Sequence, residues 1–273
     1  METAELQLTP DCPPGKIVNL LRRAGMVMVP GFADVATIRA LVLEHGEIIA
    51  RSYPRGLPPD KDWIGDPLEH ASRAPYPALR RVFHTEWVRE ICDGYLGDGC
   101  SFNEAIICTH ERRPLEPITA PHFDTIPALK FFVYLLDTNE RNGAFRYAPG
   151  THVDNAEAAR QWLARGGRLI DTPNVARADE VAQMAPICGT AGTLVIFDSN
   201  GFHTGGVLQP GEERRVVRAQ SYATPRLELW PARFSRRWFH ETRWNPLNLI
   251  RRRPKADRAA TQGTFKVRRK PDT

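Results

Sequence analysis

Two ionisable side chains placed two residues apart are the first feature of this sequence that could do chemistry. His122 and Asp124 stand in the segment Pro121-His-Phe-Asp-Thr125, just before the apolar run Leu129 to Leu136. In an extended chain residues i and i+2 point to the same face, so the imidazole and the carboxylate can converge on one ion. Because such a pair also arises by chance, as a strand-end histidine beside a turn aspartate, it needs a third ligand from elsewhere.

A third candidate ligand, His203, lies about eighty residues downstream. It ends the segment Gly192-Thr-Leu-Val-Ile-Phe-Asp-Ser-Asn-Gly-Phe-His203, in which β-favouring residues run into a polar turn that can present the ring to a cavity. Two histidines and one carboxylate on one face of an octahedral ion leave three positions open. This suits iron(II), which needs vacant positions for a chelating co-substrate and dioxygen, whereas zinc is more often tetrahedral. The spacing therefore predicts an iron(II) site made by His122, Asp124 and His203.

Eleven residues after His203, Arg214 opens the β-like segment Arg214 to Tyr222. A co-substrate such as 2-oxoglutarate, chelating iron through its keto and C1 carboxylate oxygens, would leave its distal carboxylate in need of a cation. The planar guanidinium fork suits this task. The alternative is a surface ion pair of Arg214 with Glu212 or Glu213.

Other side chains compete for the same role. Strand alternation places Arg218 on the face of Arg214 and turns Arg215 to the other face, so we rank Arg214 first and Arg218 second as 2-oxoglutarate ligands. Tyr134 and Lys130 share one face of the strand that follows the His-x-Asp segment, and either can contact 2-oxoglutarate or substrate. Core packing of Tyr134 and solvent exposure of Lys130 are the alternatives.

Several motifs in fixed order carry a resemblance to a known family. They are Gly25-Met-Val-Met-Val-Pro-Gly-Phe32, His122-Phe-Asp124, Val133-Tyr-Leu-Leu-Asp137 with Asn142-Gly143, Pro149-Gly-Thr-His152, Gly192-Thr-Leu-Val-Ile-Phe-Asp198, His203-Thr-Gly-Gly206 and Arg214-Arg215. Over residues 25–222 the sequence resembles the phytanoyl-CoA dioxygenase-like branch of the iron(II)/2-oxoglutarate oxygenases. The resemblance implies a double-stranded β-helix (jelly-roll, cupin-like) fold, the two histidines and the aspartate as iron ligands, and Arg214 as the 2-oxoglutarate anchor.

The same resemblance bears on the reaction. The related halogenases replace the carboxylate with a small residue, so Asp124 favours hydroxylation or a related oxidation, with release of succinate and carbon dioxide. The expected substrate is a small organic molecule, such as a specialised metabolite or a coenzyme A- or carrier-linked acyl group. One departure is Leu208, where the family often has an asparagine. We interpret His152, His110 and His84 as structural or surface residues.

The elements that must position these side chains are mainly β. Predicted strands are Gly25–Phe32, Phe102–Thr109, Leu129–Leu136, Ala144–Tyr147, Thr193–Phe197 and Arg214–Tyr222, and predicted helices are Val35–His45, Trp87–Leu96 and Asp154–Arg165. Asn-Gly and Pro-Gly pairs between the strands favour antiparallel connections. We expect one oxygenase domain over residues 1–224, with a lid-like loop near residues 51–77 and an extension over residues 225–273.

Charge is distributed unevenly along the chain. Residues 225–273 contain fourteen Lys and Arg against four Asp and Glu, a net charge of +10, while residues 1–224 contain 23 against 28, a net charge of −5. The aromatic and basic extension could cover the site mouth or attract an anionic or carrier-linked substrate. No apolar run is long enough to span a membrane and no signal core is present, so we expect a cytoplasmic protein.

Two other hypotheses stay open from the residues. A cupin-like protein could bind metal or 2-oxoglutarate without consuming oxygen. Alternatively, the basic extension could recruit a nucleic acid or protein as the substrate, although nucleic acid is the less favoured partner. The oligomeric state is not encoded in any motif.

Overall fold

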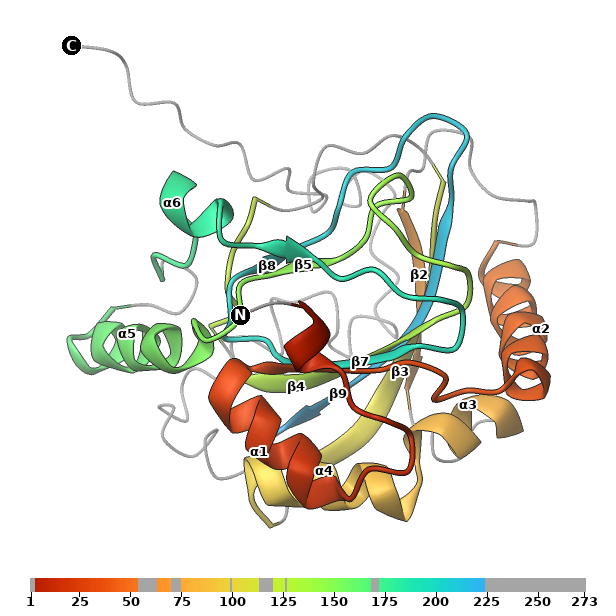
Figure 1. Ribbon diagram of the computed structural model, residues 1–273, viewed down its shortest axis with the longest axis horizontal. Coiled ribbons are helices and arrows are strands. Elements are labelled where there is room, and N and C mark those ends of the chain that lie inside the picture. The colour runs from red at the N-terminus through yellow and green to blue at the C-terminus, as the bar shows by residue number, and fades with distance from the viewer. Residues whose placement is uncertain are drawn as a thin grey trace, which may run out of the picture. The chain divides into compact units, whose positions relative to one another are not determined.

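Two antiparallel β-sheets form the framework of the computed structural model (Figure 1). It describes residues 3–53, 63–69, 75–98, 100–112, 120–125, 127–167 and 172–223. The larger sheet has the strand order β1-β7-β4-β9-β3-β2 and the smaller one β6-β5-β8. The strands are β1 (Met26–Val29), β2 (Trp63–Glu69), β3 (Ser101–Glu111), β4 (Ala128–Tyr134), β5 (Arg146–Tyr147), β6 (Ala185–Pro186), β7 (Leu194–Asp198), β8 (His203–Thr204) and β9 (Arg214–Tyr222).

Strand β7 lies between β1 and β4 in the larger sheet, and every one of its residues is buried. Its run Leu-Val-Ile-Phe suits a strand that is covered on both faces, because no position has to remain polar. The register pairs Phe197 with both Met26 and Lys130. This buried strand carries the chain directly into the turn that precedes His203.

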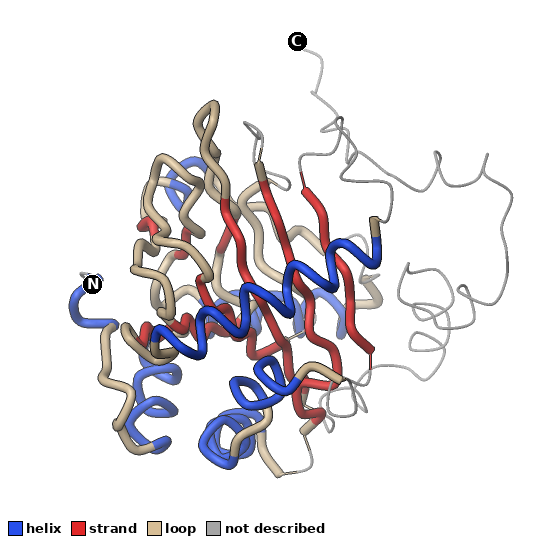
Figure 2. The backbone as a smooth tube through the Cα atoms, turned by 90° about the vertical axis from the view of Figure 1, so that its right-hand side faces the viewer, coloured by secondary structure: helices blue, strands red, loops and turns tan. Residues whose placement is uncertain are grey.

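Helices cover the outside of the sheets. They are η1 (Thr3–Leu6), α1 (Pro14–Ala24), α2 (Val35–Ser52), α3 (Pro77–Phe83), α4 (Glu86–Leu96), α5 (His152–Ala164) and α6 (Ala178–Val181). The long helix α2 crosses one face of the larger sheet (Figure 2), and α1 packs against α4. Among the described helices none is both long and apolar enough to span a membrane.

Local sequence signals explain where two of these helices begin and end. Asp34 caps α2, because its side chain accepts a hydrogen bond from the Thr37 amide at 2.7 Å. Gly25 ends α1 in the left-handed conformation, with φ of 75°, and its amide donates to the Leu21 carbonyl at 2.7 Å. A Cβ at Gly25 would also lie 2.4 Å from the Tyr147 hydroxyl, so glycine is required for space as well.

The predicted class, mainly antiparallel β-sheet with flanking helices, is confirmed. One prediction was wrong. Residues 63–69 were expected in a loop but form the edge strand β2, where the unpaired edge tolerates Pro67. Helix α2 continues seven residues beyond the predicted end, and α1 was not predicted.

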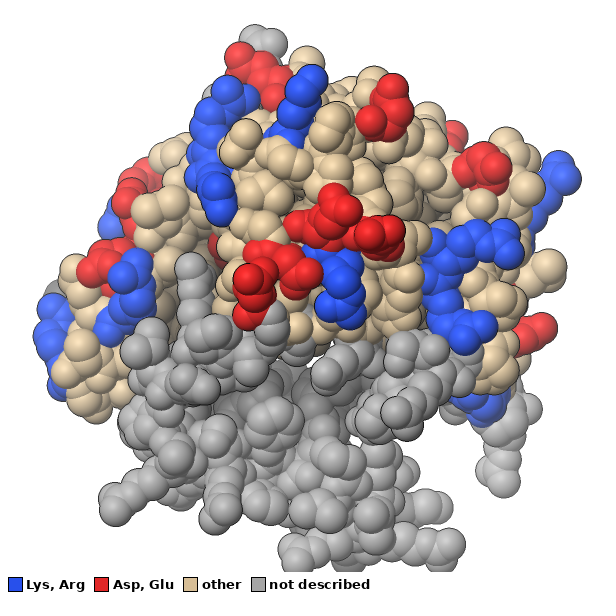
Figure 3. All heavy atoms as spheres, turned by 90° about the horizontal axis from the view of Figure 1, so that it is seen from below, with Lys and Arg blue, Asp and Glu red and all other residues tan. Residues whose placement is uncertain are grey.

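Other parts of the predicted organisation lie beyond what the structure describes. The remainder of the lid-like loop, residues 54–62 and 70–74, and the extension 225–273 are outside the described residues. Contacts divide the chain into residues 1–223 and 224–273. On the face shown in Figure 3, acidic and basic side chains of the described residues lie interspersed. This view therefore gives no continuous basic surface among the described residues.

Candidate metal centre and adjoining cavity

The segment that contains His122 is hydrogen-bonded directly to the strand that contains His203. The His122 amide donates to the His203 carbonyl at 3.0 Å, and the His203 amide donates to the His122 carbonyl at 2.7 Å. This antiparallel bridge places the two imidazoles opposite each other, with ring centroids 4.7 Å apart. The two histidines, 81 positions apart in the sequence, thus become immediate neighbours.

Asp124 completes a group of three possible metal ligands, and one ligand atom from each residue lies within 4.8 Å of the other two. Its Oδ1 is 3.5 Å from His122 Nε2 and 3.9 Å from His203 Nε2. Among the described residues this is the one such group of three or more. The donor set, two imidazoles and a carboxylate on one side of a common point, is the set that non-haem iron(II) sites use.

Both histidines are oriented by carbonyl groups of their own loops. His122 Nδ1 lies 2.9 Å from the Ala120 carbonyl, and His203 Nδ1 lies 2.9 Å from the Gly201 carbonyl. Since a carbonyl only accepts, each Nδ1 carries the proton and each Nε2 keeps a lone pair. The Nε2 atoms are the ones that face Asp124, so the loops fix the tautomer that a metal requires.

The ionisation states also suit metal binding. Burial lowers the pKa of His203 to about 3, which keeps the ring neutral at neutral pH. Burial raises the pKa of Asp124, but the positive charge of the nearby Lys130 ammonium outweighs this effect and holds that pKa well below its usual range. Asp124 is therefore an anion and His203 a neutral donor.

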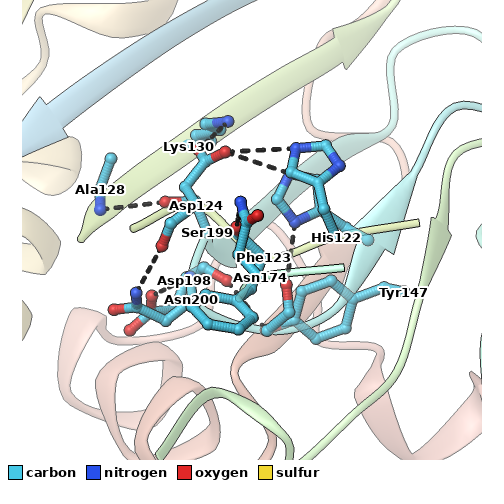
Figure 4. A network of polar contacts seen from close by, with 12 residues as sticks. His122, Phe123, Asp124, Ala128, Lys130, Tyr147, Asn174, Asp198, Ser199 and Asn200 are labelled. Carbon is cyan, nitrogen blue, oxygen red and sulfur yellow. Dashed lines mark hydrogen bonds and ion pairs between the residues drawn. The ribbon is translucent and has the colours of Figure 1, made fainter. Parts of the chain in front are cut away.

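A buried polar turn between β7 and β8 holds the His-x-Asp segment in place (Figure 4). The Asp124 amide donates to the Ser199 carbonyl at 2.7 Å, and the Asn200 side chain donates to the Asp124 carbonyl at 2.7 Å. Ser199 and Asn200 are fully buried. In the sequence these two residues stand out only as a polar turn that follows a run of β-favouring residues.

Asn174 holds the same segment from the opposite side. Its side chain donates to the Phe123 carbonyl at 2.8 Å, and the Phe123 amide donates back to the Asn174 carbonyl at 3.0 Å. Nothing in the sequence singles out Asn174, because it lies in a loop some fifty residues beyond its partner. Both flanks of the metal-ligand segment are thus fixed by hydrogen bonds to backbone atoms.

A cavity of about 290 Å³ extends from the histidines between the two sheets. Its lining combines polar and aromatic side chains: Thr109, Glu111, His122, Lys130, Phe132, Tyr134, Phe145, Phe197, His203, Thr204, Gly205, Arg214, Val216 and Arg218. This cavity is lined by all four residues predicted to contact 2-oxoglutarate or substrate, namely Arg214, Tyr134, Arg218 and Lys130. Arg215 does not line it and instead pairs with Glu213 at 3.0 Å.

Arg214 lines the cavity and is buried, with 7% of its surface exposed. Its Nη2 forms an ion pair with Glu111, the residue directly opposite on β3, and not with Glu212 or Glu213. Arg214 Nε and Nη1 are buried and have no hydrogen-bond partner among the described residues. Buried guanidinium donors without partners fit an anionic ligand group, and a carboxylate matches their geometry.

Tyr134 and Arg218 contribute differently from Arg214. Tyr134 lines the cavity, and its hydroxyl proton is committed because the hydroxyl donates to the Ile187 carbonyl at 2.8 Å. The Arg218 guanidinium lies over the Phe132 ring, 5.8 Å from its centroid. Burial lowers the pKa of Arg218, and the negative charge of Glu111 partly offsets this effect.

Three further histidines, His152, His84 and His110, and also Leu208, take structural positions. His152 Nε2 lies 3.2 Å from the Arg22 carbonyl, His84 Nε2 lies 2.8 Å from the Asn103 carbonyl, and His110 Nε2 lies 2.8 Å from Glu213. Leu208 is buried, away from the cavity lining. The departure from the family pattern at Leu208 therefore does not alter the cavity.

The chain is similar to a known protein family over part of its length. The sequence matches the phytanoyl-CoA dioxygenase (PhyH) family over residues 108–216, a range that contains both histidines, Asp124 and Arg214. This match confirms the resemblance inferred from the motifs. No curated protein matches the sequence.

Several solved structures have a similar fold. The non-heme alpha ketoglutarate dependent epimerase SnoN from nogalamycin biosynthesis aligns with a TM-score of 0.54 and 17% identity, over 76% of this chain and 81% of that chain. EctD from S. alaskensis with bound Fe aligns with a TM-score of 0.54 and 16% identity, over 78% of this chain and 78% of that chain. AviO1 from Streptomyces viridochromogenes Tue57 aligns with a TM-score of 0.52 and 18% identity, over 77% of this chain and 94% of that chain. At these identities the likeness shows a shared fold.

Proposed function

We propose that this phytanoyl-CoA dioxygenase-like chain, an iron(II)- and 2-oxoglutarate-dependent oxygenase, hydroxylates or otherwise oxidises an unactivated C–H bond of a small organic substrate. The observation that supports the proposed site is the convergence of His122, Asp124 and His203 within 4.8 Å, with both Nδ1 atoms committed to backbone carbonyls. In this proposal these three residues hold the iron. When bound, iron supplies dioxygen activation coupled to conversion of 2-oxoglutarate to succinate and carbon dioxide.

Arg214 is proposed to bind the distal carboxylate of 2-oxoglutarate. Its buried Nε and Nη1 supply donors toward the cavity, and burial strengthens a charge-assisted hydrogen bond because water does not compete. Arg218 and Tyr134 line the same cavity and are proposed to complete the co-substrate site. Phe145 and Phe197 form apolar walls there, which limits the access of water.

The cavity volume supports a small substrate. About 290 Å³ is just below the range of about 300–1,000 Å³ for small-ligand sites, so it has room for the co-substrate and the reacting part of a small molecule. Three cations, Lys130, Arg214 and Arg218, line it against one acid, Glu111, and Lys130 is also paired with Asp124. This balance favours an anionic substrate or an acyl group on an anionic carrier. The SnoN structure with Fe3+, alpha ketoglutarate and nogalamycin RO is a small-molecule precedent in this fold.

The test is turnover of 2-oxoglutarate without a known substrate. Wild-type protein with iron(II) and ascorbate should form succinate slowly and consume oxygen, while His122→Ala and Asp124→Ala should form none above background. His84→Ala, a histidine bonded to the Asn103 carbonyl outside the cavity, is the matched control and should keep wild-type turnover. Undiminished turnover in His122→Ala would refute the metal assignment. Binding of iron and 2-oxoglutarate without oxygen uptake would instead identify a non-catalytic binding protein.

A further inference from the structure

The two carboxylate oxygens of Asp124 face different groups. Oδ1 lies 3.5 Å and 3.9 Å from the Nε2 atoms of the two histidines, so it is the oxygen on the metal side. Oδ2 lies 2.5 Å from Lys130 Nζ. Figure 4 shows Lys130 and His122 beside the Asp124 carboxylate. One oxygen is thus directed to the metal position and the other is held by an ammonium group.

We propose that Lys130 is a positioning residue that restricts Asp124 to a single metal-binding oxygen and so keeps three coordination positions open. The inference rests on the proposed function, since it presumes that the three residues bind iron. It assigns to Lys130 a role in the coordination geometry rather than direct contact with the reacting atoms.

The need for such a restriction follows from coordination chemistry. A carboxylate can bind a metal through one oxygen or through both. With two histidines and a one-oxygen carboxylate, an octahedral ion has three open positions, two for a chelating 2-oxoglutarate and one for dioxygen. If Asp124 bound through both oxygens, only two positions would remain. The ammonium at Oδ2 disfavours this mode, because a second metal–oxygen bond would compete with a short charge-assisted hydrogen bond.

Lys130 is well held for this purpose. It lies on β4, two residues beyond the start of the strand, and its backbone register pairs it with Phe197 on β7 and Gln220 on β9. Its ammonium also lies over the Phe197 ring, 5.9 Å from the centroid, and only 19% of the side chain is exposed. A cation on a central strand is costly to bury unless it has a fixed partner, and Asp124 is that partner.

The experiment counts exchangeable waters on bound manganese(II), an octahedral ion that replaces iron(II) without oxygen chemistry. Line broadening in the electron paramagnetic resonance spectrum in ¹⁷O-enriched water gives the count. We expect three waters in wild-type protein and in Lys130→Arg, and two in Lys130→Met. Affinity of the manganese-loaded protein for 2-oxoglutarate should fall about 10- to 100-fold in Lys130→Met, the usual range for loss of a residue that orients a metal ligand.

Lys16→Met is the matched control, because Lys16 is exposed on α1 and its replacement changes the net charge equally. It should keep three waters and wild-type 2-oxoglutarate affinity. Three waters with unchanged 2-oxoglutarate affinity in Lys130→Met would overturn the proposal. If Lys130→Met does not fold, Lys130→Gln, whose amide is too short to hold Oδ2, makes the same prediction. Failure of the wild-type protein to bind manganese or iron would instead remove the proposed function itself.

Discussion

Replacing Arg214 with methionine is expected to affect stability and co-substrate binding through two different partners. Arg214 and Glu111 are 7% and 5% exposed, and their ion pair joins β9 to β3. Removing one member of a buried pair costs about 3–5 kcal/mol of unfolding free energy, because the remaining charge is left uncompensated. Two charge-assisted hydrogen bonds to 2-oxoglutarate, at about 1.5–3 kcal/mol each, would be lost as well. That loss, about 3–6 kcal/mol in total, corresponds to a rise of about 100- to 20,000-fold in the dissociation constant.

A double replacement separates the two effects. Arg214→Met combined with Glu111→Leu removes both charges. Replacing a buried ion pair by apolar residues often leaves stability unchanged, so the free energy of unfolding should return to within about 1 kcal/mol of wild type. Binding of 2-oxoglutarate should stay as weak as in the single variant. Guanidinium denaturation and calorimetric titration of the manganese-loaded protein measure the two quantities. A stable double variant that bound 2-oxoglutarate like wild type would refute the assignment of Arg214 as the anchor.

Three other perturbations have expected outcomes. Asn200→Ala removes a buried donor to the Asp124 carbonyl, so it should lower the free energy of unfolding by about 1–3 kcal/mol and weaken manganese binding. Denaturation and metal titration measure the two effects. No change in either would contradict the role of Asn200 in holding the Asp124 segment. Tyr134→Phe leaves the buried Ile187 carbonyl without its donor and should also cost about 1–3 kcal/mol, measured by denaturation against the exposed control Lys16→Met. Burial lowers the pKa of His45, so the ring stays neutral in the folded protein but takes up a proton on unfolding below about pH 6.5, and stability should therefore decrease as pH falls through that value. His45→Gln should flatten the decrease in melting temperature between pH 7.5 and 5.5. An unchanged slope would exclude His45 as a source of the pH dependence.

Strand periodicity was sufficient to predict which side chains share a face. Alternation along β9 placed Arg214 and Arg218 together and Arg215 opposite, and the cavity lining agrees. The same rule placed Lys130 and Tyr134 on one face of β4. These predictions succeeded because the orientation of a side chain in a strand depends on local backbone geometry alone. Turn residues and the buried run of β7 likewise indicated an antiparallel, mainly β fold.

Edge pairing was less predictable. Residues 63–69 contain glycine, proline and charged residues, which locally favour a loop. They form β2 by pairing with one edge of β3, whose other edge is paired with β9. A strand that depends on its neighbour for its hydrogen bonds leaves little trace in its own composition.

The sequence by itself determined which residues could bind a metal and a dicarboxylate: a His-x-Asp pair, a histidine after a buried strand and an arginine eleven residues later. Only the tertiary structure decided their partners. Glu111 lies opposite Arg214 across 103 positions of sequence, and the bridge between His122 and His203 brings the histidines together. Such pairings depend on the register between strands that are distant in the chain, and register is set by the packing of the whole sheet rather than by the spacing within any one segment.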